Sequence, residues 1–223
     1  LEKQFFHEWV RRNPIWGTAL GLHEECDDLL PDGSLHQLQD DIRFLHKTRE
    51  EFHRFDPKGL SPQRQVDRDF ALYWLDLKLF ELEELRFWES VPEAPLVVGR
   101  ALFQLLSRAY APLTQRLKSI MKRLERLPKY LEASRSKLVA PVKLFVENEL
   151  ETLTRLPGFL NHLKDIGRDN LPINAQRGYN KLIDSTQNAL ERYSDWLIVD
   201  VLPECREEWA IGAEKYRKLL LLR

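Results

Sequence analysis

The segment SPQRQVDRDFALYWLDLKLFELEELRFW, residues 61–88, is the longest helical pattern in the chain. Its apolar side chains recur at spacings of three and four residues, which is the period of an α-helix. They form two rows on roughly opposite sides: Val66, Phe70, Tyr73, Leu77 and Phe80 in one, and Leu72, Leu75, Leu79 and Leu82 in the other. A surface helix needs only one apolar stripe, whereas two stripes indicate neighbours on both sides. We therefore expect this helix to be the central rod of an all-α fold.

Almost every other window also has a helical pattern, and no bounded apolar–polar alternation indicates a strand. Proline, glycine and capping residues set the expected helix ends. Besides the rod, the expected helices cover residues 2–12, 14–21, 34–55, 96–109, 112–127, 128–139, a long one from 141 that Pro157-Gly158 kinks or divides, 173–202, and 213 to the last residue. Residues 22–33 are expected to be an acidic loop. The prediction is a multi-helix array around helix 61–88, without a β-sheet, in which residues 1–223 form a single domain.

Composition narrows the classes of function. The chain has 34 basic and 35 acidic residues, interleaved along the helices, which argues against a nucleic-acid or anionic-membrane surface. Arginine and lysine are densest over residues 116–129, but apolar residues at helical spacing predict the solvated face of an amphipathic helix there.

No apolar run is long enough for a membrane span. A cytoplasmic location is favoured, while a secreted protein or lipoprotein stays open because the sequence begins at Leu1, not Met.

No motif of a known catalytic centre is present. A zinc peptidase helix needs His-Glu-x-x-His, but in His23-Glu24-Glu25-Cys26 the position four residues after the histidine is Asp27. Two distant cysteines, Cys26 and Cys205, predict neither a disulfide framework nor a structural zinc site. Nucleophile elbows, phosphate-binding loops and paired Glu-x-x-His motifs are also missing from the sequence. We therefore expect no catalytic residue, cofactor ligand or metal ligand within this chain.

Several stretches together resemble one known family. They are Asn13-Pro14, TALGLH at 18–23, LPDGS at 30–34, the helix start Leu60-Ser61, RLERLPKYL at 123–131 and IGAEKY at 211–216. These stretches are similar to the bacterial domain of unknown function 885 family, whose members are largely helical and look like zinc metallopeptidases. The resemblance implies that the chain is the N-terminal half of a longer hydrolase. Its His-Glu-x-x-His motif and zinc would then lie in the missing C-terminal half, and no family ligand can be assigned to a residue here.

The same resemblance implies that this half is inactive alone and supplies one wall of a peptide-binding cleft. Candidate cleft residues are Trp16, His23 and Tyr216, although burial in an inter-helix core is the alternative for Trp16 and Tyr216. The tryptophans in general are expected in cores or between helices. The last helix shows no stop signal before Arg223, which suggests a piece of a larger protein.

Two other classes of function stay open. The first is a self-contained helical interaction or scaffold module without enzymatic activity, and the second is a carrier of a lipid or small molecule. A half-enzyme should expose apolar surface that its missing half would cover, with Leu219–Leu222 as a candidate, and should form homodimers through it. A self-contained module should instead be monomeric and polar on all sides.

Overall fold

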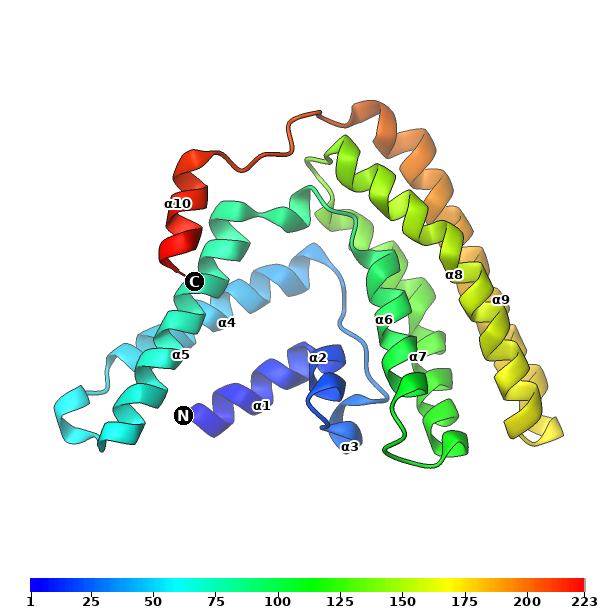
Figure 1. Ribbon diagram of the computed structural model, residues 1–223, viewed down its shortest axis with the longest axis horizontal. Helices are drawn as coiled ribbons and strands as arrows, with labels where there is room; N and C mark the ends of the chain where they lie inside the picture. Colours follow the sequence, from blue (N-terminus) through cyan, green and yellow to red (C-terminus); the bar gives the residue numbers. More distant parts are fainter. Residues whose placement is uncertain (223) are drawn as a thin grey trace.

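The computed structural model describes residues 1–222, most of which are helical (Figure 1). The α-helices are α1 (Glu2–Arg12), α2 (Pro14–Ala19), α3 (His23–Cys26), α4 (Leu35–His53), α5 (Pro62–Phe80), α6 (Ala94–Ser107), α7 (Leu113–Ser134), α8 (Lys143–Asn170), α9 (Ile173–Trp196) and α10 (Ala213–Leu221). Short 3-10 or π turns follow or join them: η1 (Pro57–Gly59), η2 (Glu81–Leu85), η3 (Phe87–Glu89), η4 (Arg135–Lys137), η5 (Leu197–Val201) and η6 (Leu202–Glu204). The described residues form no strand, apart from one isolated bridge between Val142 and Arg206. The all-α prediction is confirmed.

The helices form an arch (Figure 1). On one side α8 and α9 lie together, followed inwards by α6 and α7, while α4 and α5 form the other side. The larger hydrophobic core lies among α6 to α9, where Leu102, Leu124 and Leu160 are fully buried. A smaller core lies among α1, α4 and α5, around Leu45 and Leu75. The arch therefore has two separate cores, and α1 and α2 lie on its inner side (Figure 1).

One apolar row of α5 is buried only at its C-terminal end, where Phe80 is 4% exposed, so the expectation that both rows are buried along the whole helix was wrong. Leu72, Leu75 and Leu79 are buried against α1 and α4. On the other side, Val66 and Phe70 expose 63% and 66% of their surface. Among the described helices, it is α7 that packs against α6, α8 and α9 and so has neighbours on several sides.

The rod also ends earlier than the predicted residue 88. The α-helix stops at Phe80, continues as the π turn η2 to Leu85, and breaks at Arg86, which adopts a left-handed conformation with φ of 52°. Trp88 then folds back, and its Nε1 donates a hydrogen bond of 2.8 Å to the carbonyl of Leu82. A left-handed residue other than glycine has no marker in a helical sequence pattern, which is why the break was missed.

Two helices continue through prolines, at Pro128, where a new helix was expected to begin, and at Pro157, where a kink or division was expected. Residues 112–127 and 128–139 form the single helix α7 up to Ser134, with Pro128 inside it, and α8 passes without division through Pro157-Gly158. A proline removes one backbone hydrogen bond, but both helices bury long apolar stripes that offset this loss.

Smaller differences occur at other ends. The expected loop 22–33 contains the short helix α3, and the helix expected over 173–202 is α-helical only to Trp196 before η5 and η6. The last helix ends at Leu221, and Arg223 lies outside the described residues. Of the helices in residues 1–222, none has both the length and the apolar character that crossing a bilayer requires.

Candidate functional site

A cavity of about 630 Å³ lies on the inner side of the arch, between α1, α2, α4 and α5 on one side and α6, α7 and η4 on the other. We call it the central cavity. Aromatic side chains form much of its lining: Trp9, Trp16, Trp74, Trp88 and Tyr130. Six charged side chains also line it: Arg12, Asp41, Lys78, Glu93, Arg100 and Lys137. Apolar walls with a few charged groups are the usual composition of a site for an organic ligand.

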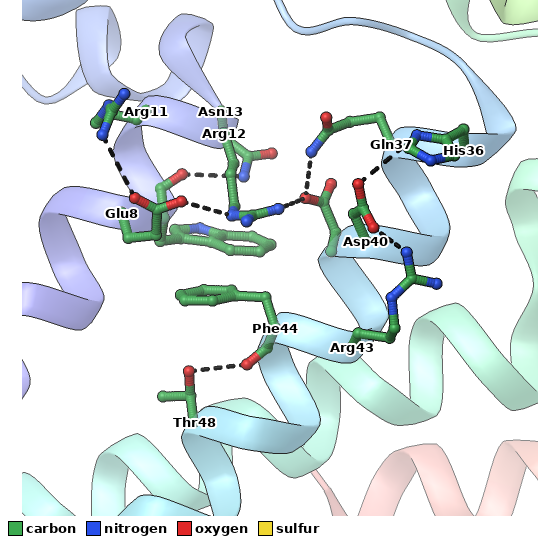
Figure 2. A network of polar contacts seen from close by, with 12 residues as sticks. Glu8, Arg11, Arg12, Asn13, His36, Gln37, Asp40, Arg43, Phe44 and Thr48 are labelled. Carbon is green, nitrogen blue, oxygen red and sulfur yellow. Dashed lines mark hydrogen bonds and ion pairs between the residues drawn. The ribbon is translucent and has the colours of Figure 1, made fainter.

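One edge of the central cavity is a network around Arg12 (Figure 2). Arg12 donates hydrogen bonds to Asp41 at 2.8 Å and to Glu8 at 3.1 Å. Gln37 donates to the same oxygen of Asp41 at 2.8 Å. The guanidinium also lies 4.7 Å from the centre of the Phe44 ring. These contacts of Arg12 hold α1 against α4.

The remaining charges of the central cavity differ in their partners. Burial raises the pKa of Asp41, and the hydrogen bonds from Arg12 and Gln37 oppose that rise. Lys78 pairs with Glu81 at 2.7 Å. Lys137 and Arg100 have no hydrogen bond or ion pair with any residue of the described chain.

A second cavity, of about 700 Å³, opens beside α3 and contains His23. The His23 ring stacks flat on Tyr110, with ring centres 3.4 Å apart and planes 1° apart. Its Nδ1 lies 3.2 Å from each carboxylate oxygen of Asp27. The hydroxyl of Tyr110 donates to Asp27, and that of Thr18 donates to it at 2.9 Å. The buried carboxylate of Asp27 thus joins α2 and α3 to the loop after α6, so part of the acidic loop expected over residues 22–33 is a packed polar cluster.

Behind this cluster lies Arg123, which is fully buried. It donates to the hydroxyl of Thr18 at 2.6 Å, to the carbonyl of Cys26 at 3.1 Å, and to the carbonyl of Ala101. Burial lowers the pKa of Arg123 to about 10, against the opposing effect of the Asp27 charge.

The prediction that residues 116–129 present their charges to solvent is wrong for Arg116 and Arg123, which are buried, whereas the other charged side chains of this segment are exposed. The spacing of apolar residues in the sequence already indicated that Arg123 is buried. Arg123 stands three residues after Ile120 and four before Leu127, inside the apolar stripe of the helix.

The structure does not bring the three predicted cleft residues together. Trp16 lines the central cavity, His23 lines the second cavity, and Tyr216 lies on α10 and lines neither of them. Core burial of Trp16 and Tyr216 was wrong, because they expose 42% and 54% of their surface; Trp209 is exposed too. Sequence reasoning missed Asp41, Arg100 and Lys137, which stand on three different elements and share no motif. Among the described residues, no group of three or more His, Cys, Asp or Glu side chains could hold a metal ion.

The fold and its cavities define an all-α arch with a ligand-sized cavity on its inner side. The family model of a bacterial protein of unknown function, DUF885, matches residues 14–222. The chain belongs to this family, as its sequence motifs indicated.

A solved structure has the same fold. It is a protein from Shewanella oneidensis described as "a putative lipoprotein of unknown function", with a TM-score of 0.86 and 19% sequence identity. The match covers 99% of this chain and 41% of that chain, so the present chain spans about two fifths of its length. At this identity the likeness shows the fold alone. A comparison with curated proteins found no match.

Proposed function

We propose that this chain is the N-terminal helical region of a longer, zinc-dependent peptidase, in which it forms one wall of the substrate cleft. The proposal rests on the resemblance of the family to zinc metallopeptidases. The described residues offer no zinc site, so we assign them no catalytic step and expect this chain alone to be inactive. Zinc bound in the remaining part of the protein would polarise the peptide carbonyl and activate a water molecule.

The structural observation that supports the proposal is the central cavity. Its volume of about 630 Å³ is that of a site for several amino-acid side chains. Aromatic walls can cover the apolar groups of a peptide, and Trp16 lines the cavity while keeping 42% of its surface exposed. We therefore assign Trp16 to the cleft wall, together with Trp74 of α5.

The test uses the full-length product of the gene that encodes this chain. We expect it to contain zinc by elemental analysis and to cleave peptides, whereas residues 1–223 alone do neither. In the full-length protein, Trp16→Ala should raise KM roughly three- to tenfold with little change in kcat, because a cleft wall binds substrate and transition state alike. Trp209→Ala is the matched control, since Trp209 is exposed and lines neither cavity. A metal-free or inactive full-length protein, or equal effects of both variants, would contradict the proposal.

A second candidate is a helical interaction module without enzymatic activity. The exposed side chains of Val66, Phe70 and Tyr73, at successive turns of α5, favour it because they form an apolar row on one helix face. The same row would be covered by the rest of the protein in the peptidase proposal.

A further inference from the structure

The charges that line the central cavity do not balance each other. Arg12 and its neighbour Arg11 are paired with Asp41 and Glu8, and Lys78 is paired with Glu81. Three charges remain: the cations Arg100 and Lys137, which have no partner among the described residues, and the carboxylate of Glu93. The cavity therefore keeps one positive charge in excess.

Of the two cations, Lys137 is the more buried. It stands in η4 and is half-buried, and burial lowers its pKa against the opposing charges of Glu93, Asp41 and Asp32. None of these carboxylates lies within 4 Å of it, since no ion pair of Lys137 exists in residues 1–222. A half-buried ammonium group without a partner has lost part of its hydration, and a bound anion would compensate this loss.

The surroundings of these cations define the rest of the ligand. The cavity is lined by Trp9, Trp16, Trp74 and Trp88, whose rings offer apolar surface beside the two positive groups. A small inorganic anion would leave this aromatic surface uncovered. A ligand with an apolar or aromatic body and one carboxylate matches both parts of the lining.

We propose that the central cavity binds the carboxylate of an organic ligand through Lys137 and Arg100 and covers its apolar body with tryptophan side chains. This inference deepens the proposed function, on which it rests for the identification of the ligand as a peptide: the carboxylate is then the C-terminus of a bound peptide. The same chemistry fits a free aromatic acid, and the experiment separates the two sources.

The test is a titration of residues 1–223 monitored by tryptophan fluorescence, because four of the six tryptophans line the cavity. The probes are N-acetyl-alanyl-phenylalanine with a free carboxylate and the same dipeptide with a C-terminal amide. We expect the acid to bind about tenfold more tightly than the amide, as a charge-assisted contact predicts. Equal affinities of the two probes, or no binding of either, would overturn the inference.

Variants then assign the preference to its residues. In Lys137→Met the preference for the acid should fall to within about twofold, and Arg100→Met should reduce it in the same direction. Lys181→Met, which removes an exposed lysine of α9 outside the cavity, should leave the preference unchanged. The melting temperature of ligand-free Lys137→Met should equal or exceed that of the wild type, because an uncompensated charge is removed. A full preference for the acid in properly folded Lys137→Met would refute the role of this lysine.

A third probe separates this inference from the proposed function. 3-Phenylpropanoate has the carboxylate and the aromatic body but no peptide bond. Binding as tight as that of the dipeptide acid would support the carboxylate site and count against the peptide cleft. Weaker binding of 3-phenylpropanoate, with the acid–amide preference retained, would support both.

Discussion

At the scale of single residues, Arg123 is a charged side chain that lies in the interior of the protein. It is fully buried, and its donors reach two backbone carbonyls and the hydroxyl of Thr18, beside the buried carboxylate of Asp27. Truncation removes these three hydrogen bonds and takes a nearby positive charge away from Asp27. Arg123→Met should therefore lower the free energy of unfolding by about 3 kcal/mol in urea denaturation.

The control for this prediction is Arg126→Met on the same helix. Arg126 is exposed and has no hydrogen bond or ion pair within residues 1–222, so its replacement should change the unfolding free energy by less than about 0.5 kcal/mol. Similar losses in the two variants would show that the Arg123 contacts contribute little.

Glu149 provides a second residue-scale prediction, on pH. Its side chain is buried and accepts the backbone N–H of Leu96 at 2.8 Å. Burial raises the pKa of Glu149 to about 7 from its ordinary value of 4.5, against the effect of that hydrogen bond. Between these two values the folded state holds more protons than the unfolded state. The stabilising contribution is therefore complete below about pH 4.5 and is lost as the pH rises through about 7.

Replacement of Glu149 by Gln should remove this dependence, because the amide oxygen can still accept from Leu96 and carries no charge. We expect Glu149→Gln to match the wild type near pH 4.5 and to be more stable at pH 8 by roughly 2–3 kcal/mol in urea denaturation. Glu147→Gln is the control, since Glu147 is exposed and two residues away on the same helix. A constant difference between Glu149→Gln and the wild type at all pH values would contradict the assignment.

At the scale of elements, local signals were reliable where a single residue type determines the backbone. Ser34 begins α4 and accepts the N–H of Gln37 as an N-cap, and Gly21 follows α2 with the positive φ expected of a helix end. Proline was the misleading signal, because the cost of Pro128 or Pro157 is set by how much apolar surface the rest of its helix buries. That burial depends on tertiary neighbours, which the sequence does not show.

Two glycines on α8 give a prediction at the element scale. A Cβ at Gly158 would meet nothing within 4 Å, whereas a Cβ at Gly167 would come within 2.3 Å of the buried Tyr179 ring. Gly158→Ala should raise the unfolding free energy by about 0.5–1 kcal/mol, since alanine loses less backbone entropy in a helix. Gly167→Ala should lower it by about 1–3 kcal/mol, because the helices α8 and α9 must move apart.

Thermal or urea denaturation of both variants checks this pair. Each substitution is the same change on the same helix, so any general effect of alanine cancels in the comparison. A gain in stability for both would mean that α9 can shift away from Gly167 at little cost.

At the scale of the whole molecule, the candidate site was largely out of reach of sequence reasoning. Trp16, which the sequence analysis proposed as a cleft residue, lines the central cavity, but Asp41, Arg100 and Lys137 come from α4, α6 and η4. Only the packing of the arch brings these elements to one cavity. The helical period predicted which faces are apolar, and it could not predict which of those faces another helix would cover, as the two rows of α5 show.

The uncovered row of α5 leads to a prediction for the whole chain. Val66, Phe70 and Tyr73 stand on successive turns, and Phe70 and Tyr73 lie in contact with ring centres 6.2 Å apart. Exposed apolar rows of this kind promote association in water. In light scattering coupled to size exclusion, residues 1–223 should form dimers as the concentration rises.

The variants decide which surface forms the dimer. Phe70→Glu should keep the chain monomeric with an unchanged circular dichroism spectrum, because Phe70 makes little contact with the core. Leu221→Glu tests the alternative surface, the C-terminal leucines that the sequence analysis proposed. Leu221 exposes 87% of its surface on α10 but lies outside the α5 row, so its replacement should leave the dimer intact. If Leu221→Glu abolishes the dimer and Phe70→Glu does not, α10 is the association surface. A wild-type chain that stays monomeric at all concentrations would remove the α5 row as an interface and leave the central cavity as the remaining candidate for function.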